Sequence, residues 1–372
     1  MKKIIWILVA LVAIILVIWG VSNKPSKPAT SAEPIKIGVV SSLTGDAAPW
    51  GEYGKKAVEL AAKTINANGG INGRQVEIAI EDDHTDGKLA VSSYNKLTSI
   101  DGVQGVIGGV FDFTAQPLLP LALTNKIAFI SPPNFQISSG FDLNDQSFVM
   151  MPRFSVVLRN LKDYISAKKV QKLAVVHFKS TWGGEIARTL DAVMKELGQN
   201  GIVDEAYNQI GNNDFKTTIA KLKAAGVQAV FLDMIANDPV NFLKRAKEQS
   251  FNPTIITYNG ALDSFANETD KSLLDGAVIL NWELNSQKFT DLYRNEYNEL
   301  PAKSADKWFD AVYVMANAIA GAKSHSEVAG YIASNIFTTP NATIKFSEVH
   351  APDTIPVEVD VMKGGVLVPW QK

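Results

Sequence analysis

The sequence of 372 residues contains no cysteine. This absence excludes disulfide bonds, thiolate nucleophiles, zinc or iron–sulfur sites with cysteine ligands, and acylation at a lipoprotein cysteine. An excess of charge of one sign is also missing, because 36 basic and 38 acidic residues leave a net charge of −2, which gives no electrostatic basis for binding nucleic acid. With 46% hydrophobic and 20% charged residues, the chain has the composition of a globular protein, and it is long enough for two domains.

The motifs of common enzymes are missing too. No Walker loop, nucleophile elbow or HExxH sequence is present, and the glycines between Gly102 and Gly109 do not fit the dinucleotide-binding fingerprint. The four histidines, at positions 84, 177, 325 and 350, fall at no ligand spacing, so we expect no metal site and no cofactor. His177 ends an apolar strand and is expected to be a hydrogen-bonded structural imidazole. An enzyme is therefore the least favoured class of function.

The acidic run from Glu81 to Asp86 contains enough oxygen and nitrogen ligands to suggest a metal ion. It follows a strand, however, and its side chains would point in different directions. We interpret it as a solvated loop.

Residues 4–21 form an uninterrupted apolar run after two lysines. As a helix this run would span roughly 27 Å, close to the hydrocarbon thickness of a bilayer. A secretory signal usually has a shorter apolar region that ends at a small-x-small cleavage site, whereas here Trp19 lies near the end of the run like an interfacial anchor. We favour an uncleaved membrane anchor over a cleaved signal sequence in residues 1–22, followed by a linker over 23–34. Either alternative places the body of the protein outside the cytoplasm.

The stretch from Lys36 to Ile78 has the pattern of strand, loop, helix, turn and strand. Its first strand is a β-branched run, Lys36–Val40, and from Glu52 to Asn66 apolar residues recur at spacings of three and four, as in an amphipathic helix. In such a βαβ unit, the loop after the first strand lies at the carboxyl edge of a parallel sheet, where open α/β sheets bind ligands. This loop carries Trp50.

Strands and helices continue to alternate along the chain in two series of comparable length. The first series ends at a predicted strand over 127–130, and the second runs from a strand over 172–177 to a strand over 254–258. This alternation predicts an α/β fold with two lobes, each a doubly wound parallel sheet. Two long helices follow, over 286–298 and 303–322, and their pattern alone would suggest a third domain.

Five segments of the chain carry a family resemblance: IKIGVVSSLTG, VIGGVFDFTAQP, IAFISPPN, TWGGEIARTL and DFKTTIAKLKAAGVQAVFLD. Over nearly everything after Glu33, the sequence resembles the periplasmic leucine/isoleucine/valine-binding proteins, the type I solute-binding proteins of amino-acid ABC importers. The resemblance implies a type I periplasmic-binding-protein fold, with one lobe from residues 35–151 and 281–339 and the other from 152–280 and 340–372. It also implies that the two late helices return to the first lobe. The three-strand hinge, with crossings near Met151–Arg153, Ile279–Trp282 and Thr338–Ile344, would let the lobes close over a ligand.

The same resemblance implies a ligand site with residues from both lobes. Trp50 matches the position whose ring lies over the bound ligand, and Trp182 matches an aromatic of the second lobe. Two facing aromatics would bury an apolar group or hold a cation. The acidic residue that pairs with the ligand's amino group in the family is matched by Asn259, which lacks the charge. The other candidates are Asp112, Phe113, Asn134 and Phe135, in the segments that bind the ligand carboxylate in the family, and Asp233 at another strand end.

These candidates depart from the family pattern in their charge. A carboxylate at Asp112 would repel a ligand carboxylate, so either a cation bridges the two groups or the ligand has no carboxylate there. Asp112 and Asp233 could instead provide negative charge for the ligand elsewhere in the site. The ligand is therefore expected to carry a positive or strongly donating group.

We expect an extracytoplasmic protein that closes on a small amino acid, amide or related amine-bearing metabolite and delivers it to an ABC permease in the membrane. The competing class is an extracytoplasmic sensing domain that reports the ligand to a membrane partner, which an appended signalling domain would support. A repressor of the same fold would need a DNA-binding head where this chain has an apolar segment.

Overall fold

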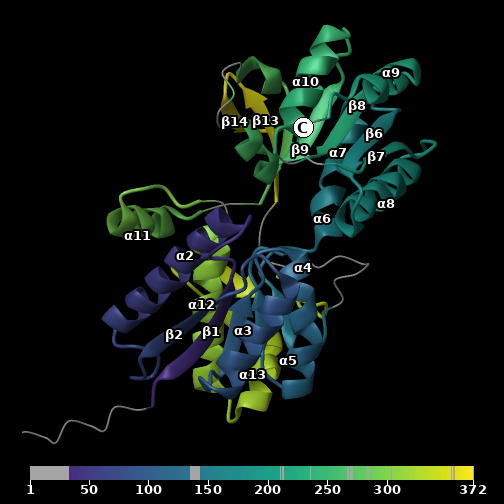
Figure 1. Cartoon of the computed structure of the whole chain (residues 1–372). Helices are drawn as coiled ribbons and strands as arrows, with labels where there is room; N and C mark the ends of the chain where they lie inside the picture. Colours follow the sequence, from purple (N-terminus) through teal and green to yellow (C-terminus); the bar gives the residue numbers. More distant parts are fainter. Residues whose placement is uncertain are drawn as a thin grey trace, which may run out of the picture.

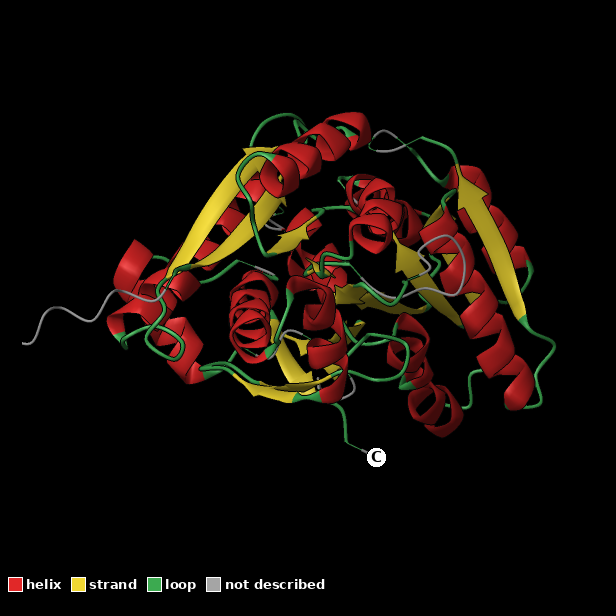
Figure 2. Ribbon diagram, turned by 90° about the horizontal axis from the view of Figure 1, so that it is seen from below, coloured by secondary structure: helices red, strands yellow, loops and turns green. Residues whose placement is uncertain are grey.

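The computed structural model describes residues 33–371, apart from 135–142 and the positions 210, 212, 235, 266, 267, 269, 270, 283, 284, 303, 353, 355 and 356. The predicted anchor and most of the predicted linker lie outside the described residues. The described elements form two lobes, each built on a β-sheet (Figure 1). Helices lie on both sides of the strands (Figure 2). In the described part of the chain, no helix is both long and apolar enough to cross a membrane.

Five parallel strands form the sheet of the first lobe, in the order β2-β1-β3-β4-β5. The register places Val39 of β1 between Ile80 of β2 and Ile107 of β3. Every residue of β1 except Lys36 is buried, because helices cover both faces of this sheet. The strands are β1 (Ile35–Ser41), β2 (Val76–Asp82), β3 (Gly105–Gly108), β4 (Phe129–Ser131) and β5 (Ser147–Val149).

The helices of the first lobe include the two late helices that the resemblance assigned to it. The predicted apolar stripe of α2 (Ala48–Ala67) is buried, and α2 begins four residues earlier than predicted because Pro49 fits the first turn of a helix. The long helix α12 (Ala305–Gly321) packs against α2, and its apolar side chains share one core with β1, so the suggestion of a third domain is wrong. The remaining helices are α3 (Gly87–Ser99), α4 (Asp112–Ala115), η1 (Gln116–Leu118), α5 (Leu119–Asn125), α11 (Gln287–Tyr297), η4 (His325–Glu327) and α13 (Val328–Ser334).

The sheet of the second lobe has seven strands in the order β14-β13-β10-β9-β8-β6-β7. Five of them pair in parallel, and β13 and β14 add an antiparallel hairpin at one edge. The strands are β6 (Leu173–Phe178), β7 (Ile202–Tyr207), β8 (Ala229–Asp233), β9 (Thr254–Tyr258), β10 (Val278–Asn281), β13 (Glu358–Lys363) and β14 (Val366–Pro369). The helices are α6 (Phe154–Arg159), α7 (Leu161–Ala167), α8 (Thr181–Glu196), α9 (Lys216–Ala224), α10 (Asp238–Glu248), η2 (Asn259–Phe265) and η3 (Lys271–Leu274).

The third crossing between the lobes lies later in the chain than predicted. Strand β12 (Thr343–Lys345) pairs with β11 (Ile336–Thr338), and Ile344 is buried in the core that contains α12. Beyond it, the His350 carbonyl accepts a hydrogen bond of 3.1 Å from the amide of Val149 in β5. The predicted boundary assigned everything from residue 340 onward to the second lobe, but Asn341 donates to Asp310 of α12, Pro352 pairs with Phe346, and the Thr354 hydroxyl donates to the Thr343 carbonyl. The chain therefore stays with the first lobe up to Thr354 before it crosses to β13.

Candidate functional site

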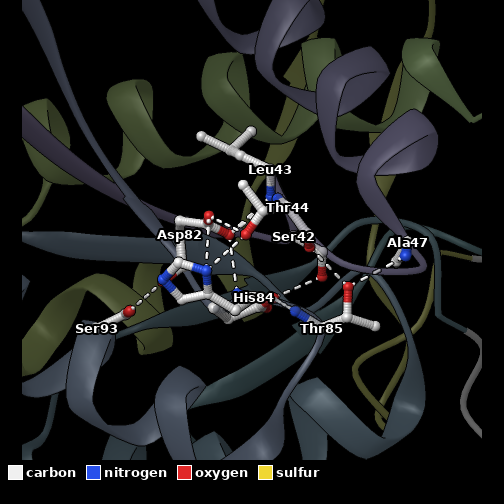
Figure 3. Close-up of polar contacts among 9 residues, drawn as sticks. Ser42, Leu43, Thr44, Ala47, Asp82, His84, Thr85 and Ser93 are labelled. Atoms are coloured by element: carbon white, nitrogen blue, oxygen red, sulfur yellow. Dashed lines mark hydrogen bonds and ion pairs between the residues drawn. The ribbon is translucent and has the colours of Figure 1, made fainter.

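The loop after β1 is fixed by hydrogen bonds to the loop after β2 (Figure 3). Asp82 Oδ1 accepts hydrogen bonds from the amides of Leu43, at 2.9 Å, and Thr44, at 3.2 Å, and Asp82 Oδ2 accepts one from the Thr44 hydroxyl at 2.7 Å. The Thr85 hydroxyl donates to the Thr44 carbonyl and accepts from the amide of Ala47. Burial alone would raise the pKa of Asp82, but the hydrogen bonds from Thr44 and the nearby amides lower it. The loop therefore presents the start of α2 from a fixed position.

Asp83 is a buried carboxylate of the same structure, so the prediction of a solvated acidic loop is wrong at this residue. Its side chain is 0% exposed, and its Oδ1 accepts hydrogen bonds from the Ser42 hydroxyl, at 2.6 Å, and the Thr85 amide, at 2.9 Å. Burial raises its pKa. Across the described residues, no group of three or more histidine and acidic side chains is placed to hold a metal ion. Asp82 and Asp83 therefore join the loop after β1 to the loop after β2.

Three aromatic side chains gather at the carboxyl edge of the first sheet. Trp50, in the first turn of α2, contacts Phe111 edge-on with ring centroids 5.7 Å apart, and Phe113 stacks on Phe111 at 5.7 Å. Trp50 is 48% exposed and Phe113 49%, so both rings present apolar surface to solvent. Gly51 lets the helix start so close to the strand, since a Cβ there would lie 2.0 Å from the Ser42 carbonyl oxygen. Of the three, Phe111 was not singled out from the sequence.

The other predicted residues of this edge are already engaged in local hydrogen bonds. Asp112 begins α4, and its Oδ1 accepts from the amide of Phe113 at 2.8 Å. The amide group of Asn134 donates to the Gly109 carbonyl at 2.9 Å and to the Ser131 hydroxyl at 2.8 Å. Phe135 lies outside the described residues.

The second lobe places Trp182 and Asp233 in direct contact. Asp233, at the carboxyl end of β8, is 5% exposed, and its Oδ1 accepts hydrogen bonds from Trp182 Nε1, at 3.2 Å, and the Tyr258 hydroxyl, at 2.7 Å. Tyr258 also packs on Trp282, with ring centroids 5.7 Å apart. Within the described residues, no hydrogen bond reaches Asp233 Oδ2. Asp233 is therefore a buried carboxylate among aromatic rings, with one oxygen that accepts no hydrogen bond from the described residues.

The buried position changes the acidity of this group. Burial raises the pKa of Asp233 to about 6, although the hydrogen bonds from Tyr258 and Trp182 and the nearby His177 favour the carboxylate. Burial and the charge of Asp233 raise the pKa of Tyr258 well above its ordinary value. The phenol therefore stays protonated and donates a hydrogen bond to Asp233. A positive group next to Asp233 would oppose the effect of burial and favour the charged carboxylate.

His177 is hydrogen-bonded on both ring nitrogens, as predicted. Its Nδ1 lies 2.7 Å from the Phe178 carbonyl oxygen, and its Nε2 lies 3.0 Å from Asp204 Oδ1. The lack of a side chain at Gly183 leaves room for the imidazole ring, since a Cβ at that position would lie 2.1 Å from His177 Nδ1. These contacts fix the strand end that precedes Trp182.

Asn259 lies beside this group at the end of β9 but is 3% exposed. Its Nδ2 donates to Asn281 Oδ1 at 3.3 Å, and its Oδ1 accepts from the Gly260 amide at 3.0 Å. Asn281 in turn donates to Asp360 of β13 at 3.0 Å. Tyr258 and Trp282 of this region were not among the site residues predicted from the sequence. An aromatic residue at or directly after the end of a buried strand was the signal that could have identified them.

Comparison with known proteins gives consistent matches over most of the chain. The family model described as periplasmic binding protein matches residues 34–345. The leucine-, isoleucine-, valine-, threonine- and alanine-binding protein of Pseudomonas aeruginosa is 26% identical over 331 residues, which cover 86% of this chain and 87% of that protein.

Solved structures share the fold. The branched-chain amino acid transporter substrate-binding protein LivJ of Streptococcus pneumoniae, in complex with isoleucine, aligns with a TM-score of 0.75 and 23% identity, covering 90% of this chain and 97% of that one. A solute-binding protein of an ABC transporter from R. palustris, in complex with benzoate, aligns with a TM-score of 0.71 and 18% identity, covering 90% and 95%.

Proposed function

The chain belongs to the periplasmic binding protein family, and from this premise we propose that it binds a small amino acid, amide or related amine-bearing metabolite and delivers it to an ABC permease. Proteins of this family act outside the cytoplasm, and the proteins that the chain matches are substrate-binding proteins of transporters rather than enzymes. The amino acids named for the relatives support the ligand class, and the benzoate complex shows that this fold also serves other carboxylates.

One observation carries the choice of an amine-bearing ligand. Asp233 is a buried carboxylate with an unused acceptor oxygen and aromatic neighbours, which is the chemistry that suits an ammonium group. We propose that the ligand lies between Trp50 and Phe113 of the first lobe and Trp182 and Asp233 of the second. The first lobe would comprise residues 35–151 and 282–354, and the second 152–281 and 355–372. Asp112, Asn134, Phe135 and Asn259 remain proposed as neighbours of the ligand.

A thermal-shift screen tests this function. The twenty amino acids, their amides, simple alkylamines and aromatic acids should include at least one compound that raises the melting temperature. A ligand at 100 times its dissociation constant adds about 2.7 kcal/mol to the stability of the folded state. A screen in which only compounds without an amine or amide stabilise the protein would contradict the proposed ligand class.

We also propose that residues 4–21 anchor the protein to the membrane. The full-length protein should then remain in the membrane fraction of cells, while a chain beginning at Glu33 should be soluble and bind ligand equally well. N-terminal sequencing of the mature protein checks this prediction, since a mature chain that begins after Ser22 or Ala32 would show cleavage instead.

A further inference from the structure

Arg153 differs from the other arginines of the chain in having no side-chain partner among the described residues. All six arginines lie in the described residues, and five of them donate to a carbonyl or pair with a carboxylate: Arg74 with Glu33, Arg159 with Glu196, Arg188 with Glu185, Arg245 with Glu248 and Arg294 with Asp291. Arg153 makes no side-chain hydrogen bond or ion pair with the described residues, and its Nε is shielded from solvent. A shielded donor without an acceptor is destabilising, so this arrangement calls for an acceptor that is supplied from outside.

The position of Arg153 is set by the fold. The residue follows the carboxyl end of β5 and precedes α6, at the first crossing between the lobes. Its backbone is fixed, because its carbonyl accepts hydrogen bonds from the amides of Val156, at 3.0 Å, and Val157, at 3.1 Å. The side chain itself is half-buried.

Arg153 belongs to the same sheet edge as the proposed ligand site. Strands β1, β3, β4 and β5 are mutually parallel, so the segments that follow them leave the sheet at one edge. These segments carry Trp50, Asp112, Asn134 and Arg153, respectively. Arg153 is the only residue of these four with a positive charge.

Among the described candidate residues of this edge, Arg153 is the strongest donor for an anion. Asp112 is itself acidic, Phe113 has no polar side-chain atom, and the amide group of Asn134 already donates to Gly109 and Ser131. A guanidinium can donate two parallel hydrogen bonds to a carboxylate. We propose that Arg153 binds the carboxylate of the ligand. This inference rests on the proposed function and makes the ligand a zwitterion, with its ammonium at Asp233 and its carboxylate at Arg153.

Paired probes test this assignment by calorimetry on the full chain. L-leucine, L-threonine and L-phenylalanine are each compared with the corresponding carboxamide, which keeps the ammonium and removes the negative charge. Arg153→Gln should weaken binding of the acids about tenfold and leave the amides unchanged, so that the preference for acid over amide disappears. Arg153→Lys, which keeps the charge but not the two parallel donors, should give a smaller loss.

Two controls separate a binding role from a structural one. Without ligand, the melting temperature of Arg153→Gln should equal that of the wild type, since Arg153 makes no side-chain hydrogen bond or ion pair with the described residues. Arg159→Gln, in the same helix region, should keep the preference for acids. Equal binding of the acids by wild type and Arg153→Gln overturns the assignment alone, as does an equal loss for acids and amides. A wild-type protein that binds none of the six probes overturns both the assignment and the amino-acid part of the proposed function.

Discussion

Replacing Trp50 with alanine should weaken ligand binding about ten- to a hundredfold. Trp50 is 48% exposed, so a ligand that covers the ring would remove a large apolar area from water. Burying an aromatic side chain is worth about 1.5–3 kcal/mol, and every 1.4 kcal/mol corresponds to a factor of about ten in affinity. Calorimetric titration with the compound that stabilises the protein most in the thermal-shift screen measures this loss.

The fold itself should tolerate this change. Trp50 contacts Phe111 only at the edge of its ring, so the melting temperature without ligand should stay close to that of the wild type. Trp50→Phe should retain part of the affinity because it keeps an aromatic face. Ile100→Ala, which removes an exposed apolar side chain at the end of α3, serves as the matched control. If Trp50→Ala binds as tightly as the wild type, the ligand does not lie over this ring.

Replacing Asp233 with asparagine should weaken binding of amine-bearing ligands about ten- to a hundredfold, because a hydrogen bond to a charged group contributes about 1.5–3 kcal/mol. Ligands without an ammonium group should be affected much less.

The pKa of Asp233 also predicts how the affinity for amines depends on pH. Burial raises this pKa to about 6 and favours the neutral acid, whereas a bound ammonium favours the carboxylate. Affinity for amines should therefore fall about tenfold between pH 7 and pH 5, and Asp233→Asn should abolish most of this dependence.

A second aspartate provides the control for this prediction. Asp214 precedes helix α9, pairs with Lys216 and has a side chain that is 61% exposed. Asp214→Asn should keep both the affinity and its pH dependence. Calorimetric titrations of each variant at pH 5 and pH 7 test the role of Asp233. An unchanged affinity of Asp233→Asn for amine-bearing ligands would mean that the ammonium group lies elsewhere.

The pattern of the sequence predicted the regular part of the fold because that part depends on local periodicity. The strand Lys36–Val40 and the helix after it were identified from their apolar spacing, and both are present as β1 and α2. The chain from Asp112 to Asn125 forms three short helices, α4, η1 and α5, rather than one, since Pro117 and Pro120 each remove a backbone donor. The hairpin of β13 and β14 was missed because its place in the second sheet depends on pairing with β10, far away in the sequence.

In the candidate site too, single residues could be predicted from their local sequence, but the contacts between them could not. Trp182 and Asp233 were singled out individually, but their hydrogen bond joins residues 51 positions apart, and no local pattern contains it. Tyr258 completes this group from a third strand. Arg153 could not be identified as a ligand contact from the sequence, because its distinguishing property, the lack of a side-chain partner among the described residues, depends on the fold.

The central claim is that the two lobes close on a small ligand between them. Small-angle X-ray scattering of the protein with and without a saturating concentration of the compound from the screen tests this most directly, since closure about a hinge brings the lobes together. We predict that the radius of gyration decreases when the ligand binds. An unchanged radius of gyration, with saturation proven by calorimetry, would contradict closure and indicate a site that is already formed in the free protein.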